Sequence, residues 1–251
     1  MKSNHSFCGC EPLREKGTQL CMAGRFKEAV ETWKKVLAIH PDDERAWGNM
    51  GICFSELDMK SKAIECFDKA LSFNPNYVFA LSNKASCLAR DQRYEEALEL
   101  TDKVLSLDPN YHDALVNKGV ILTKQNKYKE SIPILDKALA VNPNNPLALC
   151  KRGAATLELF LQKYPNTTFL EFDKKFPGDR FPLKELTDNM KYLHQAMELA
   201  PARIETWYYM GIHMYLMGHP MAVSFFERVL GADPDHEGAR KYLTLAKKAR
   251  G

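Results

Sequence analysis

A proline recurs at a nearly constant interval along this chain, each time at the end of an apolar run with helical spacing. These residues are Pro41, Pro75, Pro109, Pro143, Pro201 and Pro234. The first four are 34 residues apart, the fifth follows after 58 and the sixth after 33. This spacing indicates six copies of one unit, the fifth enlarged by an insertion of about 24 residues. A chain with this period is expected to stack similar units in a row, each contacting its neighbours.

Two further positions recur with the prolines, one small and one large. The small position holds Gly17, Gly51, Ala85, Gly119, Gly153 and Gly211. The large position holds Trp33, Phe67, Leu135, Leu193 and Phe226, with Thr101 in its place in the third copy. Small side chains let two helices approach closely, so the small position is expected where helices cross.

Each copy contains two apolar stripes in helical spacing, separated by a short polar stretch. In the second copy, Trp47, Met50 and Phe54 belong to the first stripe, and Ala63 and Phe67 belong to the second. The stretches AGRF, LDMK, DQRY and QNKY separate the stripes of the first four copies. The sequence therefore predicts two antiparallel helices per copy, with proline as the stop signal.

One proline departs from this pattern. Pro133 falls inside the second helix of the fourth copy, where it removes one backbone donor. We expect a late start or a kink in that helix.

The second copy reads Trp47-x2-Met50-Gly51-x2-Phe54, followed by Ala63, Phe67, Ala70 and Pro75. In this pattern the chain resembles the tetratricopeptide repeat (TPR) family. The resemblance implies an all-α, right-handed superhelical solenoid of about six TPR units with a C-terminal capping helix. It also implies a concave groove lined by the first helix of each repeat.

The predicted organisation is a leader, six repeats and a cap. The leader covers residues 1–9, the repeats cover 10–43, 44–77, 78–111, 112–145, 146–203 and 204–236, and the capping helix covers 237–251. In the cap, Ala239, Tyr242, Leu243 and Ala246 are expected to form the inner face.

The insertion lies at about residues 160–183 and is rich in aromatic residues. They are Phe160, Tyr164, Phe169, Phe172, Phe176 and Phe181. We expect the insertion to extend the first helix of the fifth repeat, then turn and pack at one edge of the superhelix. It serves either as a partner-specific lip or as structural filler.

Three asparagines are the strongest candidates for a binding site. Asn49, Asn83 and Asn117 recur every 34 residues at a position that faces the groove in the family resembled. An asparagine amide offers a donor and an acceptor, so a row of them can hold the backbone of an extended peptide. The alternative is that asparagine simply tolerates solvent at this position.

Basic and aromatic side chains are predicted to accompany the asparagines in the groove. The basic residues are Arg14, Arg45, Arg90, Lys124 and Lys151. They favour a ligand with acidic character, although solvated surface charge explains them equally well. Tyr208, Tyr209 and Tyr215 in the sixth repeat suit a partner's apolar anchor, unless the enlarged fifth repeat covers them. Of the carboxylate clamp found in some family members, the matching positions keep one asparagine and lack the lysine and arginine, so a standard clamp is not expected.

Composition and motifs argue against several classes of function. A net charge of +3 is too balanced for a protein whose main role is gripping phosphate backbone, so no nucleic acid partner is expected. No membrane span and no export signal are evident, and the seven irregularly spaced cysteines do not suggest a disulfide framework. A cytoplasmic location fits best. No metal site, cofactor motif or catalytic constellation is recognised, His5, Cys8 and Cys10 lying in the leader without a fourth ligand.

The sequence thus favours a non-enzymatic adaptor that binds an extended peptide or a helix of another protein in its groove. The alternative is a self-assembling scaffold, in which repeats or the leader of one copy pack on another. A mass that depends on concentration would favour self-association.

Overall fold

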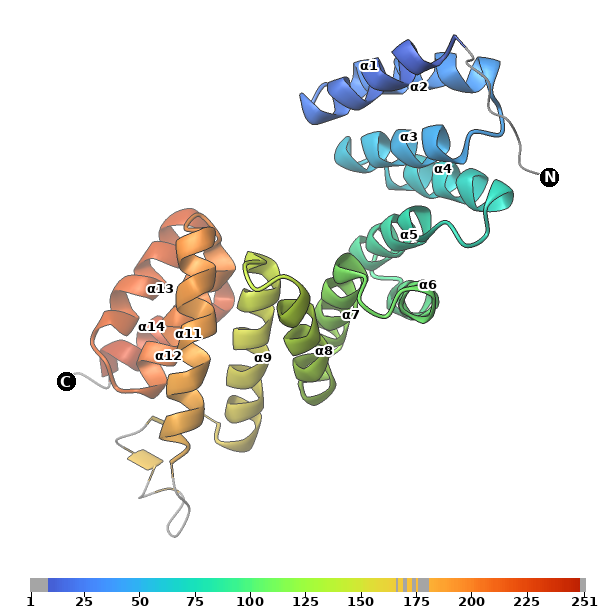
Figure 1. Cartoon of the computed structure of the whole chain (residues 1–251). Coiled ribbons are helices and arrows are strands. Elements are labelled where there is room, and N and C mark those ends of the chain that lie inside the picture. The colour runs from blue at the N-terminus through green and yellow to red at the C-terminus, as the bar shows by residue number, and fades with distance from the viewer. Residues whose placement is uncertain (1–8, 166, 169–170, 173–174, 176–180, 249–251) are drawn as a thin grey trace. The chain divides into compact units, whose positions relative to one another are not determined.

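The computed structural model describes residues 9–165, 167–168, 171–172, 175 and 181–248, which form α-helices joined by short turns without any β-strand (Figure 1). The chain divides into two compact units, Met1–Asn117 and Lys118–Gly251. The all-α repeat fold expected from the sequence is confirmed. Leader residues 1–8, with His5 and Cys8, lie outside the described residues, as do Phe169 and Phe176 of the insertion.

The N-terminal unit consists of helical pairs. The pairs are α1 (Glu11–Met22) with α2 (Phe26–Ile39), α3 (Glu44–Glu56) with α4 (Lys60–Phe73), and α5 (Val78–Arg90) with α6 (Tyr94–Leu107). Helix α7 (His112–Lys124) begins in this unit and ends in the next. The first helices also contact one another in sequence, α1 with α3 and α3 with α5. They therefore form a continuous wall, which we call the first-helix wall.

The C-terminal unit contains longer helices around the insertion. Its elements are α8 (Tyr128–Val141), α9 (Pro146–Lys163), α11 (Leu183–Leu199), α12 (Ile204–Leu216), α13 (Met221–Ala232) and α14 (Glu237–Lys248). Helix α9 has 18 residues against 13 in α3, so the insertion does extend the first helix of the fifth repeat. Helix α14 packs on α12 and α13. It buries Ala239, Tyr242 and Ala246, the inner face expected of a cap.

Glycine marks the places where paired helices cross, as predicted. A Cβ atom on Gly51 would lie 2.6 Å from the Phe67 ring, and one on Gly211 would lie 2.6 Å from the Phe226 ring. The third repeat solves the same crossing differently, with buried Ala85 and Thr101 at the corresponding positions. An added methyl group on one helix is matched by a smaller side chain on the other.

The turn between paired helices contains a residue in the left-handed region of backbone space. In the first repeat and the sixth this residue is a glycine, Gly24 (φ 70°) and Gly218 (φ 67°). In the second, third and fourth it is Asp58, Gln92 or Asn126, with φ between 57° and 62°. The separating stretches are thus confirmed as tight turns that end the first helix.

The late start expected for the helix with Pro133 is wrong. Helix α8 begins at Tyr128, 34 residues after the start of α6 at Tyr94, and Pro133 lies inside it. Buried Tyr128 donates a hydrogen bond from its hydroxyl to Asn126 Oδ1 (2.7 Å). Helix α8 therefore begins in the same register as α6, although Pro133 lacks the N–H that an interior helix residue donates.

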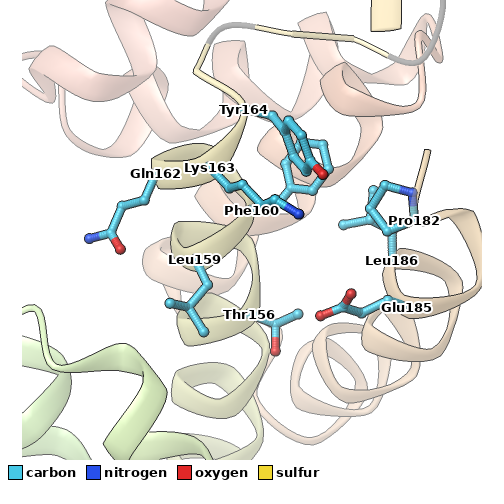
Figure 2. Close-up of a pocket in the computed structure, with 9 residues that line it drawn as sticks. All are labelled: Thr156, Leu159, Phe160, Gln162, Lys163, Tyr164, Pro182, Glu185 and Leu186. Carbon is cyan, nitrogen blue, oxygen red and sulfur yellow. The ribbon is translucent and has the colours of Figure 1, made fainter. Parts of the chain in front are cut away.

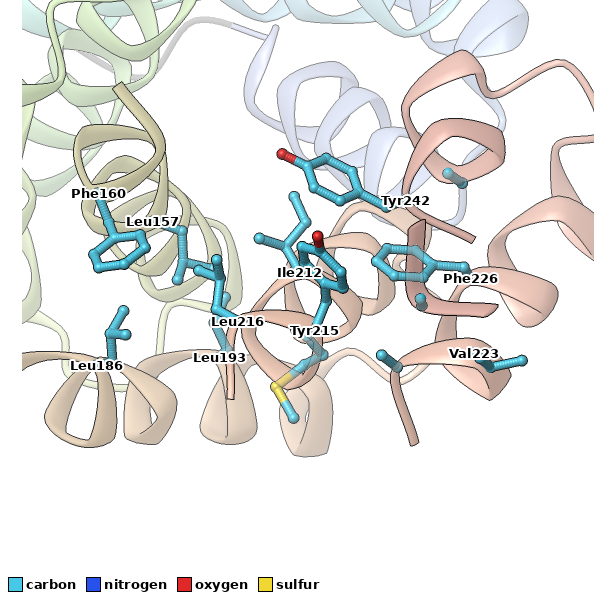
Figure 3. Close-up of a cluster of buried hydrophobic side chains, with 14 of the residues drawn as sticks. Leu157, Phe160, Leu186, Leu193, Ile212, Tyr215, Leu216, Val223, Phe226 and Tyr242 are labelled. Carbon is cyan, nitrogen blue, oxygen red and sulfur yellow. The ribbon is translucent and has the colours of Figure 1, made fainter. Parts of the chain in front are cut away.

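The two units bury their apolar residues in different ways. In the N-terminal unit, separate clusters lie within and between successive pairs, around Trp33, Phe67 and Leu81. In the C-terminal unit, a single cluster runs from α9 through α11, α12 and α13 to α14 (Figure 3). It includes Phe160 of the insertion and Tyr242 of the capping helix, so the insertion and the cap share one core.

Candidate peptide-binding surface

The three asparagines lie on the first-helix wall of the N-terminal unit, one each on α3, α5 and α7. All three side chains are half-buried, but their hydrogen bonds differ. Asn83 Nδ2 donates to the carbonyl of Phe79 in its own helix (2.8 Å). Asn117 Nδ2 donates to Ser86 Oγ on α5 (2.7 Å). Within the described part of the chain, the Asn49 amide makes no hydrogen bond.

The three asparagines therefore do not offer the same hydrogen-bonding groups to a ligand. Asn83 and Asn117 each spend one N–H inside the protein and keep the carbonyl oxygen, among the described residues, as an unpaired acceptor. Asn49 keeps the whole amide. The repeat places the three side chains in register, whereas the neighbour of each one decides what hydrogen-bonding capacity remains.

Arg14 connects the first two repeats instead of standing as a separate groove charge. Its Nε and Nη2 atoms lie 2.9 Å and 2.7 Å from Asp43 Oδ2. The other oxygen of Asp43 accepts hydrogen bonds from the backbone N–H groups of Arg45 and Ala46, which caps the start of α3. The guanidinium charge is thus balanced by the capping carboxylate.

Arg45 and Arg90 are exposed on helices of the wall. Arg90 forms an ion pair with Asp58 (3.2 Å) and a hydrogen bond with Ser55 Oγ (3.2 Å). Arg45 has no ion pair among the described residues. Of the predicted basic residues in this unit, Arg45 offers the most freely available charge.

The predicted basic residues of the C-terminal unit differ in burial. Lys124 is exposed at the end of α7, whereas Lys151 is only 5% exposed. Lys151 forms an ion pair with Glu205 at the start of α12. The expectation that Lys151 presents a charge to a ligand is therefore corrected, because its charge is neutralised inside the protein. The signal available in sequence was the opposite charge at the start of the following repeat's first helix.

Tyr208 and Tyr209 are half-buried on α12 and contact the protein extensively. The Tyr209 hydroxyl donates to Glu158 Oε1 (3.2 Å) on α9. Tyr208 packs against His236, with ring centroids 4.6 Å apart, and its hydroxyl lies beside Gly238. Burial raises the pKa of both phenols and also that of the Glu158 carboxyl. Both tyrosines thus spend much of their surface on α9 and the cap.

Tyr215 is a core residue and not a groove residue, which corrects the sequence expectation. It is 6% exposed and its ring lies 5.6 Å from that of Tyr242 on α14 (Figure 3). The capping helix covers this side of α12. His213 on the same helix is also buried, and burial lowers its pKa to about 4.

The described aromatic residues of the insertion pack on one another and on the core. Phe172 lies edge-on to Tyr164 and to Phe181, with ring centroids 4.9 Å and 5.1 Å apart. A cavity of about 480 Å³ remains between the end of α9 and the start of α11, lined by Phe160, Tyr164, Glu185 and their neighbours (Figure 2). These aromatic side chains support the interpretation of the insertion as structural filler.

An apolar groove of about 750 Å³, which the sequence did not predict, lies on the N-terminal unit. Trp47, Met50 and Phe54 of α3 line it, together with Cys66 of α4. Lysine and acidic side chains from α2 and α4 form its rim. Trp47 and Phe54 were recognised as stripe residues, but the sequence does not show that part of this stripe stays accessible.

Cys10 is also placed differently from the expectation that it belongs to the leader. It is fully buried at the start of α1. Among the described residues, no group of three or more potential ligands could hold a metal ion. None of the helices in the described part has the length and apolar character that a membrane span requires.

Sequence models of the tetratricopeptide repeat match residues 44–77, 66–99 and 88–149. No curated protein matches the chain. The matched residues span the second, third and fourth predicted repeats.

Solved structures with similar folds cover nearly the whole chain. PilF of Pseudomonas aeruginosa shares 17% identity at a TM-score of 0.73, over 94% of this chain and 99% of that one. PilW, a type IV pilus biogenesis factor, shares 19% identity at a TM-score of 0.70, over 95% of this chain and 100% of that one. YrrB, a TPR protein with an unusual peptide-binding site, shares 19% identity at a TM-score of 0.58, over 87% of this chain and 99% of that one. At such identities the likeness concerns the fold.

The 34-residue period, the glycine-marked helix crossings and the matched segments agree with one another. Together they show that residues 44–149 of this chain consist of tetratricopeptide repeats.

Proposed function

We propose that this protein is a non-enzymatic adaptor whose first-helix wall binds an extended peptide of a partner protein. A TPR fold is a protein-interaction scaffold, and its neighbours among solved structures are of the same kind.

The observation that carries the proposal is the hydrogen-bonding capacity left on the wall. Asn49 has an unpaired amide, and Asn83 and Asn117 have carbonyl oxygens without partners among the described residues. These groups lie one repeat apart on helices that follow one another along the wall. An extended peptide has N–H and C=O groups to pair with them, whatever its side chains.

Two further facts support this choice of ligand. YrrB, which has the same fold, carries a peptide-binding site. Exposed Arg45 has no ion pair among the described residues, so an acidic side chain on the peptide would gain a partner. We therefore propose a peptide held mainly through its backbone, with an acidic residue near α3.

The test is affinity capture from lysate with the wild type and with an N49A/N83A/N117A variant, followed by calorimetry with peptides from the captured protein. Partners should be lost by this variant and kept by N76A/N110A, which removes exposed asparagines from turns at the same 34-residue spacing. N-methylation of the peptide backbone should weaken binding more than replacement of most side chains. Equal capture by both variants would contradict the proposal.

Self-association remains the second candidate, proposed from sequence. Light scattering after size exclusion at several concentrations separates the two. A mass that rises with concentration and survives N49A/N83A/N117A would favour the scaffold, whereas a constant monomer mass favours the adaptor.

A further inference from the structure

Two cysteines from neighbouring repeats touch in the N-terminal unit. Cys21 in the last turn of α1 and Cys53 in α3 have Sγ atoms 3.0 Å apart. Both are free thiols. Because a disulfide bond is about 2.05 Å long, the two sulfurs need to approach by roughly 1 Å to become bonded.

The two thiols differ in their access to solvent. Cys53 is fully buried in a cluster with Trp33 and Met50, whereas Cys21 is half-buried at the edge of that cluster. A small oxidant arriving from solvent therefore meets Cys21 first. Burial, followed by the hydrogen bond with Cys21, raises the pKa of the Cys53 thiol. The Cys53 thiol is thus a poor target for peroxide itself, and we expect it to react only after Cys21 has been oxidised.

We propose that Cys21 and Cys53 form a peroxide-sensitive modification site that closes to a disulfide between α1 and α3. The Cys21 thiolate attacks hydrogen peroxide, the O–O bond breaks, and Cys21 becomes a sulfenic acid as hydroxide leaves. The Cys53 sulfur then attacks the Cys21 sulfur. The S–S bond forms, the S–O bond breaks, and the oxygen leaves as water with the proton of Cys53. The two thiols lose two electrons, and the peroxide is reduced to two waters.

The repeat supplies an internal comparison for this site. At the same two positions 34 residues later stand Ser55 and Cys87, with the Cys87 sulfur 3.4 Å from the Ser55 hydroxyl. Repeat geometry therefore brings this pair of positions together at successive interfaces. At the interface of the first two repeats both positions carry sulfur, and at the next one a hydroxyl prevents the bond.

The location gives the bond a consequence. The first hairpin packs on α3 through the interface that contains these thiols. Among the described elements this hairpin packs on one neighbouring repeat, and repeats with few neighbours open more easily than those packed on both sides. A disulfide from α1 to α3 would hold this hairpin to the second repeat.

The experiment treats the full chain with hydrogen peroxide, alkylates the remaining thiols in denaturant and digests with trypsin. Residues 17–25 contain Cys21 and residues 46–60 contain Cys53, each as the one cysteine of its peptide. We expect these peptides to appear linked within one chain. Hydrogen exchange of α1 and α2 should then slow at least tenfold, an effect absent in C21S.

A matched variant tests the geometry independently. C53S/S55C removes the native pair and places a thiol beside Cys87, so peroxide should link residues 46–60 to 85–90 instead. Circular dichroism checks that each variant folds, and C21A serves as a second variant that lacks the Cys21 thiol. The proposal is overturned if oxidised wild type leaves Cys53 fully alkylatable, with Cys21 converted to sulfinic acid or linked to another chain.

Discussion

The N-terminal and C-terminal units are built from the same repeat yet bury their apolar residues differently. Regular spacing in the N-terminal unit yields separate clusters around Trp33, Phe67 and Leu81. In the C-terminal unit, the long α9 and α11, the insertion aromatics and the cap join into one cluster. The comparison teaches that the repeat sets where helices cross, while side-chain size and insertions decide how far a core extends.

Polar side chains differ between the units in the same direction. The first-helix wall keeps exposed Arg45 and the amide of Asn49, which has no hydrogen-bond partner among the residues that the structure describes. The C-terminal unit instead pairs Lys151 with Glu205 and Tyr209 with Glu158. The same repeat positions thus stay open in one unit and are used for internal contacts in the other. This is why our binding proposal concerns the N-terminal wall.

The largest expected effect comes from emptying the large position in each unit. F226A and F67A each remove a fully buried ring that packs on a glycine, at a cost of about 3–5 kcal/mol. Because the C-terminal core is continuous, F226A should speed hydrogen exchange in α9 and α11 through α14 together. F67A should affect α3, α4 and α5 while leaving α1 and α2 largely protected. Equal spreading in both variants would contradict the distinction between the cores.

Acid should destabilise the C-terminal unit through His213. The imidazole is 2% exposed and its pKa falls from an ordinary 6.5 to about 4, so the unfolded chain binds its proton first. Its neutral form therefore supports folding fully above pH 6.5, and up to about 3 kcal/mol is lost as pH falls towards 4. H213L should remove this loss, measured as hydrogen exchange of α12 at pH 7 and at pH 4.5.

Glu158 acts in the opposite sense and is controlled in the same experiment. Burial raises the pKa of its carboxyl, so its protonated form favours folding and that stability is lost as pH rises through the raised value. Comparing H213L in an E158Q background isolates the histidine, since glutamine can still accept from the Tyr209 hydroxyl. An unchanged pH response in H213L would show that other groups govern acid unfolding.

A medium effect is expected where paired helices cross. G51A places a methyl group 2.6 Å from the Phe67 ring and should cost about 1–3 kcal/mol. Adding F67T copies the buried Ala85 and Thr101 pair of the third repeat, and this change should cost less in the G51A variant than in the wild type. Urea unfolding of the single and double variants measures the coupling. If the losses in unfolding free energy of the two single variants simply add in the double variant, the third repeat tolerates Ala85 with Thr101 for another reason.

The smallest expected effect concerns a turn. Gln92 is exposed with φ at 62°, where the first and sixth repeats have Gly24 and Gly218. Q92G should relieve left-handed strain and stabilise the N-terminal unit by about 1 kcal/mol, while G24A should destabilise it by a similar amount. Thermal unfolding followed by circular dichroism detects both changes, and a lower melting temperature for Q92G would refute the assignment of strain.

Much of the fold was predictable from local pattern alone. Turn stretches, glycine at the crossings and apolar stripes repeat every 34 residues, and each depends on residues close in sequence. The start of α8 was predicted wrongly because a single proline was given more weight than the 34-residue register, which the helix follows. Burial of Tyr215 was missed because α14 covers it from a separate helix.

The repeat, the helix pairs and the row that holds Asn49, Asn83 and Asn117 could be derived from the amino-acid sequence, because periodic spacing and near-neighbour packing specify them. Which polar groups stay available depends on side chains that reach across an interface, so this became visible in the three-dimensional structure. In the structure Lys151 pairs with Glu205, Arg14 pairs with Asp43 at the N-terminus of α3, and Cys21 contacts Cys53. A repeat period is visible in a single sequence, whereas contacts between side chains of different repeats are not.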